Sequence, residues 1–114
     1  MKRSWTIGLL ILATASAQMK PYAATFMQAM DAGMKQMDRD MSAAPMNGNA
    51  DHDFAAMMIP HHRGAIDMAK AELSYGNDPV IRRLAQEILV DQQSEIEAMQ
   101  LWLSKHAGGG KDKQ

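Results

Sequence analysis

Two adjacent histidines, His61 and His62, directly follow a proline in a stretch that otherwise has the composition of a helix. Methionines flank the pair on both sides, at Met57, Met58 and Met68. Imidazole nitrogens bind copper, zinc, nickel and iron, whereas a thioether narrows the choice to soft ions such as Cu(I). Ag(I) is similarly soft. The residue types therefore predict a site for Cu(I), with Ag(I) and Cu(II) as further candidates.

Polar residues on a later helical segment are expected to face this cluster. Gln92 and Glu95 interrupt a face that is otherwise apolar, and Met99 follows one turn later. Folding the chain as a hairpin about Asn77 places positions 61 and 62 opposite position 92, within about one turn. Buried polar groups must be satisfied. Either a histidine hydrogen-bonds to Glu95 or Gln92 in a structural network, or the cluster holds a metal, and we favour the metal.

The two histidines need not play the same part. Neighbouring side chains on a helix point about 100° apart. His61 and His62 therefore share one ion only if Pro60 distorts the turn. In the alternative, one imidazole ligates while the other is oriented by a hydrogen bond to Glu95, with Gln92 in a similar supporting position.

A second set of thioethers lies nearer the N-terminus, spaced three and four residues apart along one helical face. Its members are Met27, Met30, Met34, Met37 and Met41. Eleven of the 12 methionines lie after residue 17, where there are only five leucines. Leu and Met have nearly equal helix propensity, so propensity does not explain the excess. The stripe is either a core-facing surface built from Met or a row of secondary metal sites.

Three helices are expected to position these groups, at about residues 22–41, 51–75 and 79–106. Asn49 or Asp51 can cap the second, and Gly76 ends it. Asp78 caps the third. Pro60 predicts a kink or a restart within the second helix. No strand pattern occurs, so the predicted fold is all-α: an antiparallel hairpin plus an N-terminal Met-rich helix, forming a small helical bundle.

The two ends of the chain differ in composition from its middle. Residues 1–17 combine Lys2 and Arg3 with an apolar run and a small-residue motif, which is typical of a secretory signal peptide. Residues 18–50 form the Met-rich helix and loop, 51–106 the hairpin domain and 107–114 a Gly-rich tail expected to be disordered. We therefore expect a periplasmic or secreted protein that does not associate with the membrane after cleavage.

Charge and cysteine content narrow the function further. Removing residues 1–17 takes away two basic residues and changes the formal charge from −1 to −3. Without a basic patch, nucleic acid is not an expected partner. The chain has no cysteine, so no disulfide stabilises it. A metal ion or a second copy of the chain would add stability to a domain of this size.

The stretch from Asp51 to Leu103 resembles the bacterial DUF305 family of ferritin-like helical proteins, which includes CopM-type periplasmic copper-binding proteins. The matching residues are Asp53, Phe54, Met58, His61, His62, Ala65, Met68, Ala69, Gln92, Glu95, Ile96 and Met99. The resemblance implies copper binding through ligands among Met57, Met58, His61, His62, Met68 and Met99. His52, near the start of the same stretch, is a further candidate ligand.

The favoured hypothesis is a copper-binding protein for sequestration, resistance or delivery, with copper-export or copper-acceptor proteins as partners. An enzyme is not expected, because the Glu-x-x-His and His-Glu-x-x-His patterns of common metal-dependent catalysts do not occur. The alternative is a metal-independent helical interaction module. Three helices leave one side of a bundle open, so a homodimer is plausible in either case.

Overall fold

The computed structural model describes residues 22–107. This part of the chain contains three helices, α1 (Tyr22–Ser42), α2 (Ala50–Tyr75) and α3 (Pro79–His106), and no strand. The predicted all-α fold is therefore confirmed for the described residues. None of the three helices is long and apolar enough to cross a membrane. The predicted signal peptide and nearly all of the predicted tail lie outside the described residues.

The helices begin where side chains can cap them. The Asn49 side chain accepts a hydrogen bond from the backbone N–H of His52 at 3.0 Å, which starts α2. Asp78 accepts hydrogen bonds from the backbone N–H groups of Val80 and Ile81 at 2.9 and 3.0 Å. Pro79 stands at the first position of α3, where a missing N–H costs nothing. These caps place both helix starts within one residue of their predicted positions.

The turn between α2 and α3 is fastened by Arg82. One of its Nη1 hydrogen bonds goes to the carbonyl of Leu73 at 2.6 Å and the other to the carbonyl of Gly76 at 3.0 Å. The last carbonyls of a helix have no partner within the helix. Arg82 therefore satisfies groups at the end of α2 from the first turn of α3, and holds the two helices antiparallel.

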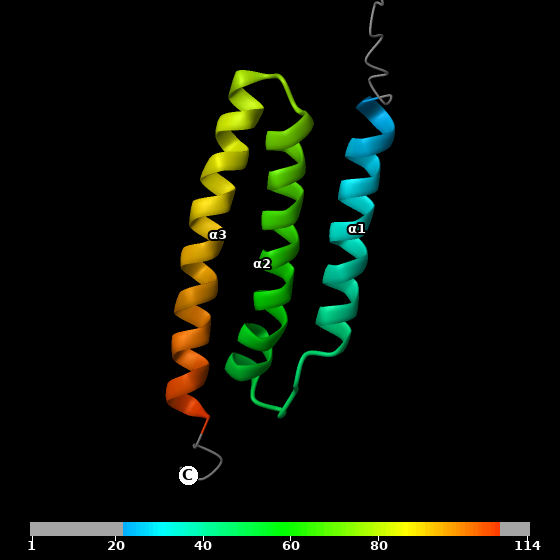
Figure 1. Cartoon of the computed structure of the whole chain (residues 1–114). Coiled ribbons are helices and arrows are strands. Elements are labelled where there is room, and N and C mark those ends of the chain that lie inside the picture. The colour runs from blue at the N-terminus through cyan, green and yellow to red at the C-terminus, as the bar shows by residue number, and fades with distance from the viewer. Residues whose placement is uncertain (1–21, 108–114) are drawn as a thin grey trace, which may run out of the picture.

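The three helices form a single layer (Figure 1), in which α2 lies between α1 and α3. No Cα atom of α1 lies within 8 Å of a Cα atom of α3. The largest buried side chains, Ile59, Ile66 and Ile96, gather where α2 meets α3. The half-buried residues packed around them are Leu89, Met99 and Leu103. The core thus lies inside the hairpin, which is also where the candidate ligands are.

Two glycines lie at the contact between α1 and α2, and one of them is needed there. A Cβ at Gly64 would lie 2.6 Å from the sulfur and 2.8 Å from the Cβ of Met37. A Cβ at Gly33 would lie 3.4 Å from the Cβ of Asp67, which is an ordinary contact. The absence of a side chain at Gly64 therefore lets α1 approach α2 closely at Met37.

One expectation about the second helix needs correction. α2 runs unbroken through Pro60, so the predicted restart does not occur. Pro60 is buried in the layer, where packing on both sides of α2 favours a continuous helix. The apolar residues Ile81, Leu84 and Ile88 of α3 are all more than two-fifths exposed. Their helix packs only on α2, so this side of it has no neighbour among the described helices.

Candidate metal centre

His62 is the buried polar residue at the centre of the hairpin, with 8% of its surface exposed. Its Nε2 lies 2.5 Å from Oε2 of Glu95 on α3. A carboxylate can only accept in such a contact, so Nε2 carries the hydrogen and donates it. The other ring nitrogen, Nδ1, is then left with a lone pair. The contact thus joins α2 to α3 and determines which nitrogen can bind a metal.

Two buried atoms at this level of the hairpin have no hydrogen-bond partner. They are Nδ1 of His62 and Oε1 of Gln92, and they are the only such side-chain atoms among the described residues. Buried polar atoms without a partner are rare and call for an explanation. As placed, and with a neutral imidazole, both atoms are acceptors, so neither satisfies the other. A cation is a group that can satisfy a buried acceptor of this kind.

A thioether lies beside the imidazole. Met99 lines a hollow of about 300 Å³ together with His62, Glu95, Phe54 and Ala98. Met99 is half-buried and packs against the isoleucine core. Met58 is also half-buried and precedes His62 by four residues, which places it on the same face of α2. The hollow therefore combines imidazole and thioether groups.

His61 is a neighbour of His62 but faces elsewhere. Its ring centroid lies 5.9 Å from that of His62, and the ring planes are inclined by 60°. His61 is exposed, whereas His62 is buried. Because α2 is unbroken at Pro60, the helical divergence of the two side chains is retained. In this structure the two histidines do not face a common point between α2 and α3.

The remaining predicted residues of α2 lie apart from the His62 hollow. Met57 is 36% exposed, and Met68 lines a separate groove with Phe26 and Met30. His52 lies ten residues before His62, or about 15 Å along the helix. The structure therefore brings Glu95 and Met99 to His62, with Met58 and Gln92 one turn away on the same helices, while Met57, Met68 and His52 lie elsewhere.

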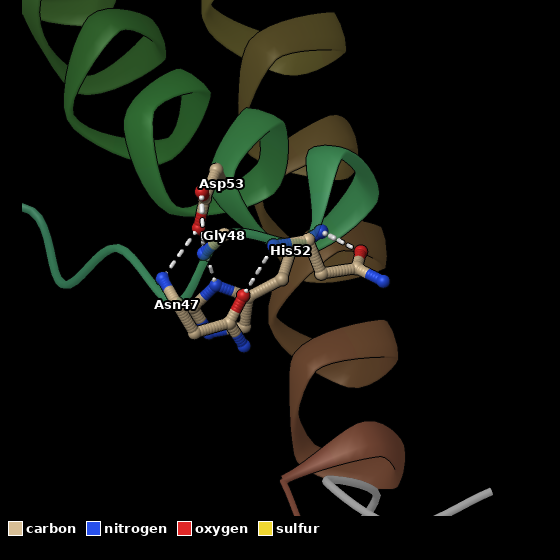
Figure 2. A network of polar contacts seen from close by, with 5 residues as sticks. Asn47, Gly48, His52 and Asp53 are labelled. Carbon is tan, nitrogen blue, oxygen red and sulfur yellow. Dashed lines mark hydrogen bonds and ion pairs between the residues drawn. The ribbon is translucent and has the colours of Figure 1, made fainter. Parts of the chain in front are cut away.

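His52 belongs to a polar network at the start of α2 (Figure 2), where its Nδ1 lies 3.0 Å from Oδ1 of Asp53. The Asp53 carboxylate also accepts hydrogen bonds from the backbone N–H groups of Asn47 and Gly48, at 2.8 and 3.1 Å. The His52 hydrogen bond and then the Asn47 N–H lower the pKa of Asp53 below its ordinary value. Asp53 thereby ties the preceding loop to α2.

The N-terminal methionines are divided between the core and the surface. Met37 packs against Gly64, and Met30 and Met41 are half-buried. Met27 and Met34 are 59% and 41% exposed. Met37 therefore lies in a helix interface, as expected of a core-facing stripe, whereas Met27 and Met34 are accessible from solvent, and secondary metal sites on α1 stay a prediction.

The sequence analysis did not identify His106 and Trp102 as candidate site residues. Their rings stack with centroids 4.1 Å apart and planes inclined by 15°, and both residues line a hollow with His52. Folding the chain about Asn77 pairs position 52 with position 102, so the same arithmetic that located Glu95 could have located this pair. Among residues 22–107, no three His, Asp or Glu side chains are gathered closely enough to hold a metal by themselves.

Comparison with known proteins identifies relatives without a described function. The family model for "domain of unknown function (DUF305)" matches residues 8–103, which include α1 and its methionines. An uncharacterized protein of Acanthamoeba polyphaga mimivirus is 43% identical over 49 residues. That alignment covers 43% of this chain and 32% of the viral protein, so the match spans about a third of the relative's length. Neither description mentions a metal, so the likeness to CopM-type proteins stays a prediction.

Proposed function

The chain belongs to the DUF305 family, and from the chemistry of its own site we propose that it is a copper-binding protein that takes Cu(I) between α2 and α3. The observation that carries the proposal is the pair of unpartnered buried acceptors, Nδ1 of His62 and Oε1 of Gln92. A bound cation removes the cost of leaving them unsatisfied. The adjacent thioethers favour a soft ion.

The residues around His62 suit this role in different ways. His62 supplies a neutral imidazole nitrogen, and Met99 and Met58 supply thioether sulfur. Glu95 accepts the Nε2–H of His62 and so orients the ring, as a carboxylate commonly does for a metal-ligating histidine. Ag(I) would occupy the same thioether-rich site, while Cu(II) fits it less well because it prefers nitrogen and oxygen.

The predicted signal peptide supports a location in the periplasm or outside the cell. There we propose that the protein sequesters copper or passes it to copper-export or acceptor proteins. The exposed Met27 and Met34 would add weaker Cu(I) sites on α1, where an incoming ion or a partner can reach them. No catalytic role is proposed.

Anaerobic titration with Cu(I) against a competing chelator tests the proposal. We expect His62→Gln to weaken binding by on the order of tenfold or more, and His61→Gln to leave the affinity of this site nearly unchanged. Met99→Leu conserves volume, so it should lower affinity while changing the free energy of unfolding of the metal-free protein by less than about 1.5 kcal/mol. Met46→Leu, in the exposed loop, is the matched control. If His62→Gln, Met99→Leu and the parent protein all bind Cu(I) with the same affinity, the site is refuted.

A second candidate function is supported by the open side of the layer. A groove of about 400 Å³ between α1 and α3 is lined by apolar side chains that include Phe26, Met30, Leu84 and Ile88. Such a surface suits association with a second copy of the chain. The solution mass with and without copper separates the two functions: a dimer whose mass and fold are indifferent to copper favours the interaction module, and a copper-dependent change favours metal binding.

A further inference from the structure

The open end of the hairpin, opposite the Gly76–Asp78 turn, contains a second group of metal-binding side chains. The first turn of α2 and the last turns of α3 meet there (Figure 1) around a hollow of about 380 Å³. Its lining residues are Asn47, Asn49, Asp51, His52, Trp102 and His106. We call this hollow the end pocket. None of these residues carries sulfur, which sets the end pocket apart from the His62 hollow.

The His52 imidazole is held with one nitrogen available. Its Nδ1 lies 3.0 Å from Oδ1 of Asp53 (Figure 2). Since Asp53 also receives hydrogen bonds from two backbone N–H groups, it acts as an acceptor throughout. Nδ1 therefore donates and Nε2 keeps its lone pair. Donation of the second ring N–H to a carboxylate is the usual state of a metal-ligating histidine.

The His106 imidazole is held in a corresponding way. Its Nδ1 lies 2.7 Å from the backbone carbonyl of Trp102, and a carbonyl can only accept. Nε2 again keeps its lone pair. The stacked ring of Trp102 restricts the orientation of the imidazole. His106 also lies in the last turn of α3, where the partial negative charge of the helix end favours a cation.

A carboxylate completes the set. Asp51 lies in the first turn of α2, lines the same pocket and is exposed. Two imidazole nitrogens with one carboxylate oxygen suit borderline divalent ions such as Zn²⁺, Ni²⁺ and Cu²⁺. The described residues do not already gather three such groups at one point, so the exposed Asp51 side chain must rotate onto an ion held by the two imidazoles.

We propose that the end pocket is a second metal site, in which Nε2 of His52, Nε2 of His106 and the Asp51 carboxylate bind a divalent transition-metal ion. This site is chemically distinct from the Cu(I) site proposed at His62. It lies about 15 Å away along α2, and it shares no ligand with that site. The protein would thus bind a soft monovalent ion at the His62 hollow and a borderline divalent ion at the end pocket.

Trp102 provides a direct optical test with Ni²⁺ as the probe. The sequence has two tryptophans, and Trp5 lies within the predicted signal peptide, so Trp102 is the single emitter of the processed chain. Ni²⁺ quenches tryptophan only at short range, and the protein should carry no histidine tag. We expect saturable quenching, with a dissociation constant that rises by on the order of tenfold or more in His52→Gln and in His106→Gln. His61→Gln, another exposed histidine, should leave it unchanged.

Competition with Zn²⁺, the helix content of the variants and the result for His62→Gln complete the test. Zn²⁺, which does not quench, should compete with Ni²⁺ and restore the emission. Circular dichroism should show the same helix content in every variant, because His106 is exposed and His52 is replaced by a polar residue. The absence of saturable quenching, or an unchanged affinity in both His52→Gln and His106→Gln, overturns the second site. His62→Gln should not affect quenching, so failure of the Cu(I) proposal is measured separately.

Discussion

At the level of single residues, the contact between His62 and Glu95 decides which nitrogen of the imidazole can take a metal. The carboxylate keeps the hydrogen on Nε2 and leaves Nδ1 buried without a partner. A network built only for stability would be expected to satisfy both nitrogens. The unpaired nitrogen is therefore the feature on which the proposal of a bound ion rests.

The role of Glu95 in orienting the His62 ring can be tested without replacing a proposed metal ligand. Glu95→Ala removes the acceptor of the Nε2–H, so the ring loses its fixed tautomer and orientation. We expect Cu(I) affinity to fall by about 10- to 100-fold, which is typical for the loss of such a supporting group. Glu97→Ala, two residues further along α3 and exposed, is the matched control. If competitive Cu(I) titration gives the same affinity for both variants, Glu95 does not orient the ligand.

The meeting of His62 and Glu95 could be predicted from the sequence, because a short turn between two long helices determines which positions lie opposite each other. The separation of His61 from His62 could not be predicted with the same certainty. It depended on whether Pro60 would interrupt α2, and packing on both sides of α2 kept the helix continuous. The predicted restart is therefore wrong, while the predicted kink stays a prediction.

At the level of helices, Gly64 sets the distance between α1 and α2. In Gly64→Ala the new methyl group would clash with both the sulfur and the Cβ of Met37, so a rotation of the flexible thioether alone cannot relieve it. We expect a loss of about 2 kcal/mol in the free energy of unfolding. Chemical denaturation of the metal-free protein measures this loss.

Gly33→Ala is the matched control for that substitution, because it places a methyl group in the same interface at an ordinary contact distance. The higher helix propensity of Ala should make it neutral or stabilising by up to about 1 kcal/mol. Equal effects of the two substitutions would show that helix propensity, not the close approach at Met37, governs both positions.

The start of α2 offers a pH-dependent test. The pKa of Asp53 in the folded state is below its ordinary value of 3.8, because the charged form accepts hydrogen bonds from His52 and the loop. Its contribution to stability is therefore present above about pH 4 and is lost as the pH falls through the folded pKa. In metal-free protein, Asp53→Asn should lower the thermal midpoint at pH 7, and this deficit should shrink below pH 4.

Asp91→Asn, which neutralises an exposed carboxylate of α3, controls for the change in net charge. Thermal midpoints from circular dichroism should show no comparable deficit for it at pH 7. A deficit of Asp53→Asn that stays constant down to pH 2 would mean that the charge of Asp53 does not contribute to stability.

The cap residues Asn49 and Asp78 could be predicted from the sequence, but the hydrogen bonds from the N–H groups of Asn47 and Gly48 to Asp53 depend on the loop conformation.

At the level of the whole molecule, the position of α1 is the feature that the sequence left open. Its methionine stripe predicted an apolar face but not the helix that would cover it. In the structure α1 packs on α2 alone, and Ile81, Leu84 and Ile88 stay exposed as a result. Amphipathic spacing identified these residues as apolar and aligned, but whether they are covered depends on which helices come together.

The layer places the two proposed metal sites at different heights along α2, which leads to a prediction for the molecule as a whole. Ligand binding to the folded state stabilises it by an amount set by concentration and affinity, about 2.7 kcal/mol at a hundredfold excess over the dissociation constant. Sites more than about 10 Å apart that share no ligand act additively. Under reducing, anaerobic conditions, we expect Cu(I) and Ni²⁺ together to stabilise the protein by the sum of their separate effects.

The same experiment assigns each effect to its site. His62→Gln should remove only the Cu(I) contribution, and His106→Gln only the Ni²⁺ contribution, as measured by denaturant unfolding at fixed free-metal concentration. A combined effect no larger than that of one ion alone would mean that both compete for a single place, which contradicts two sites. Additivity that persists in both variants would instead place binding elsewhere, and for Cu(I) the candidates outside the hairpin are the exposed Met27, Met34 and Met46.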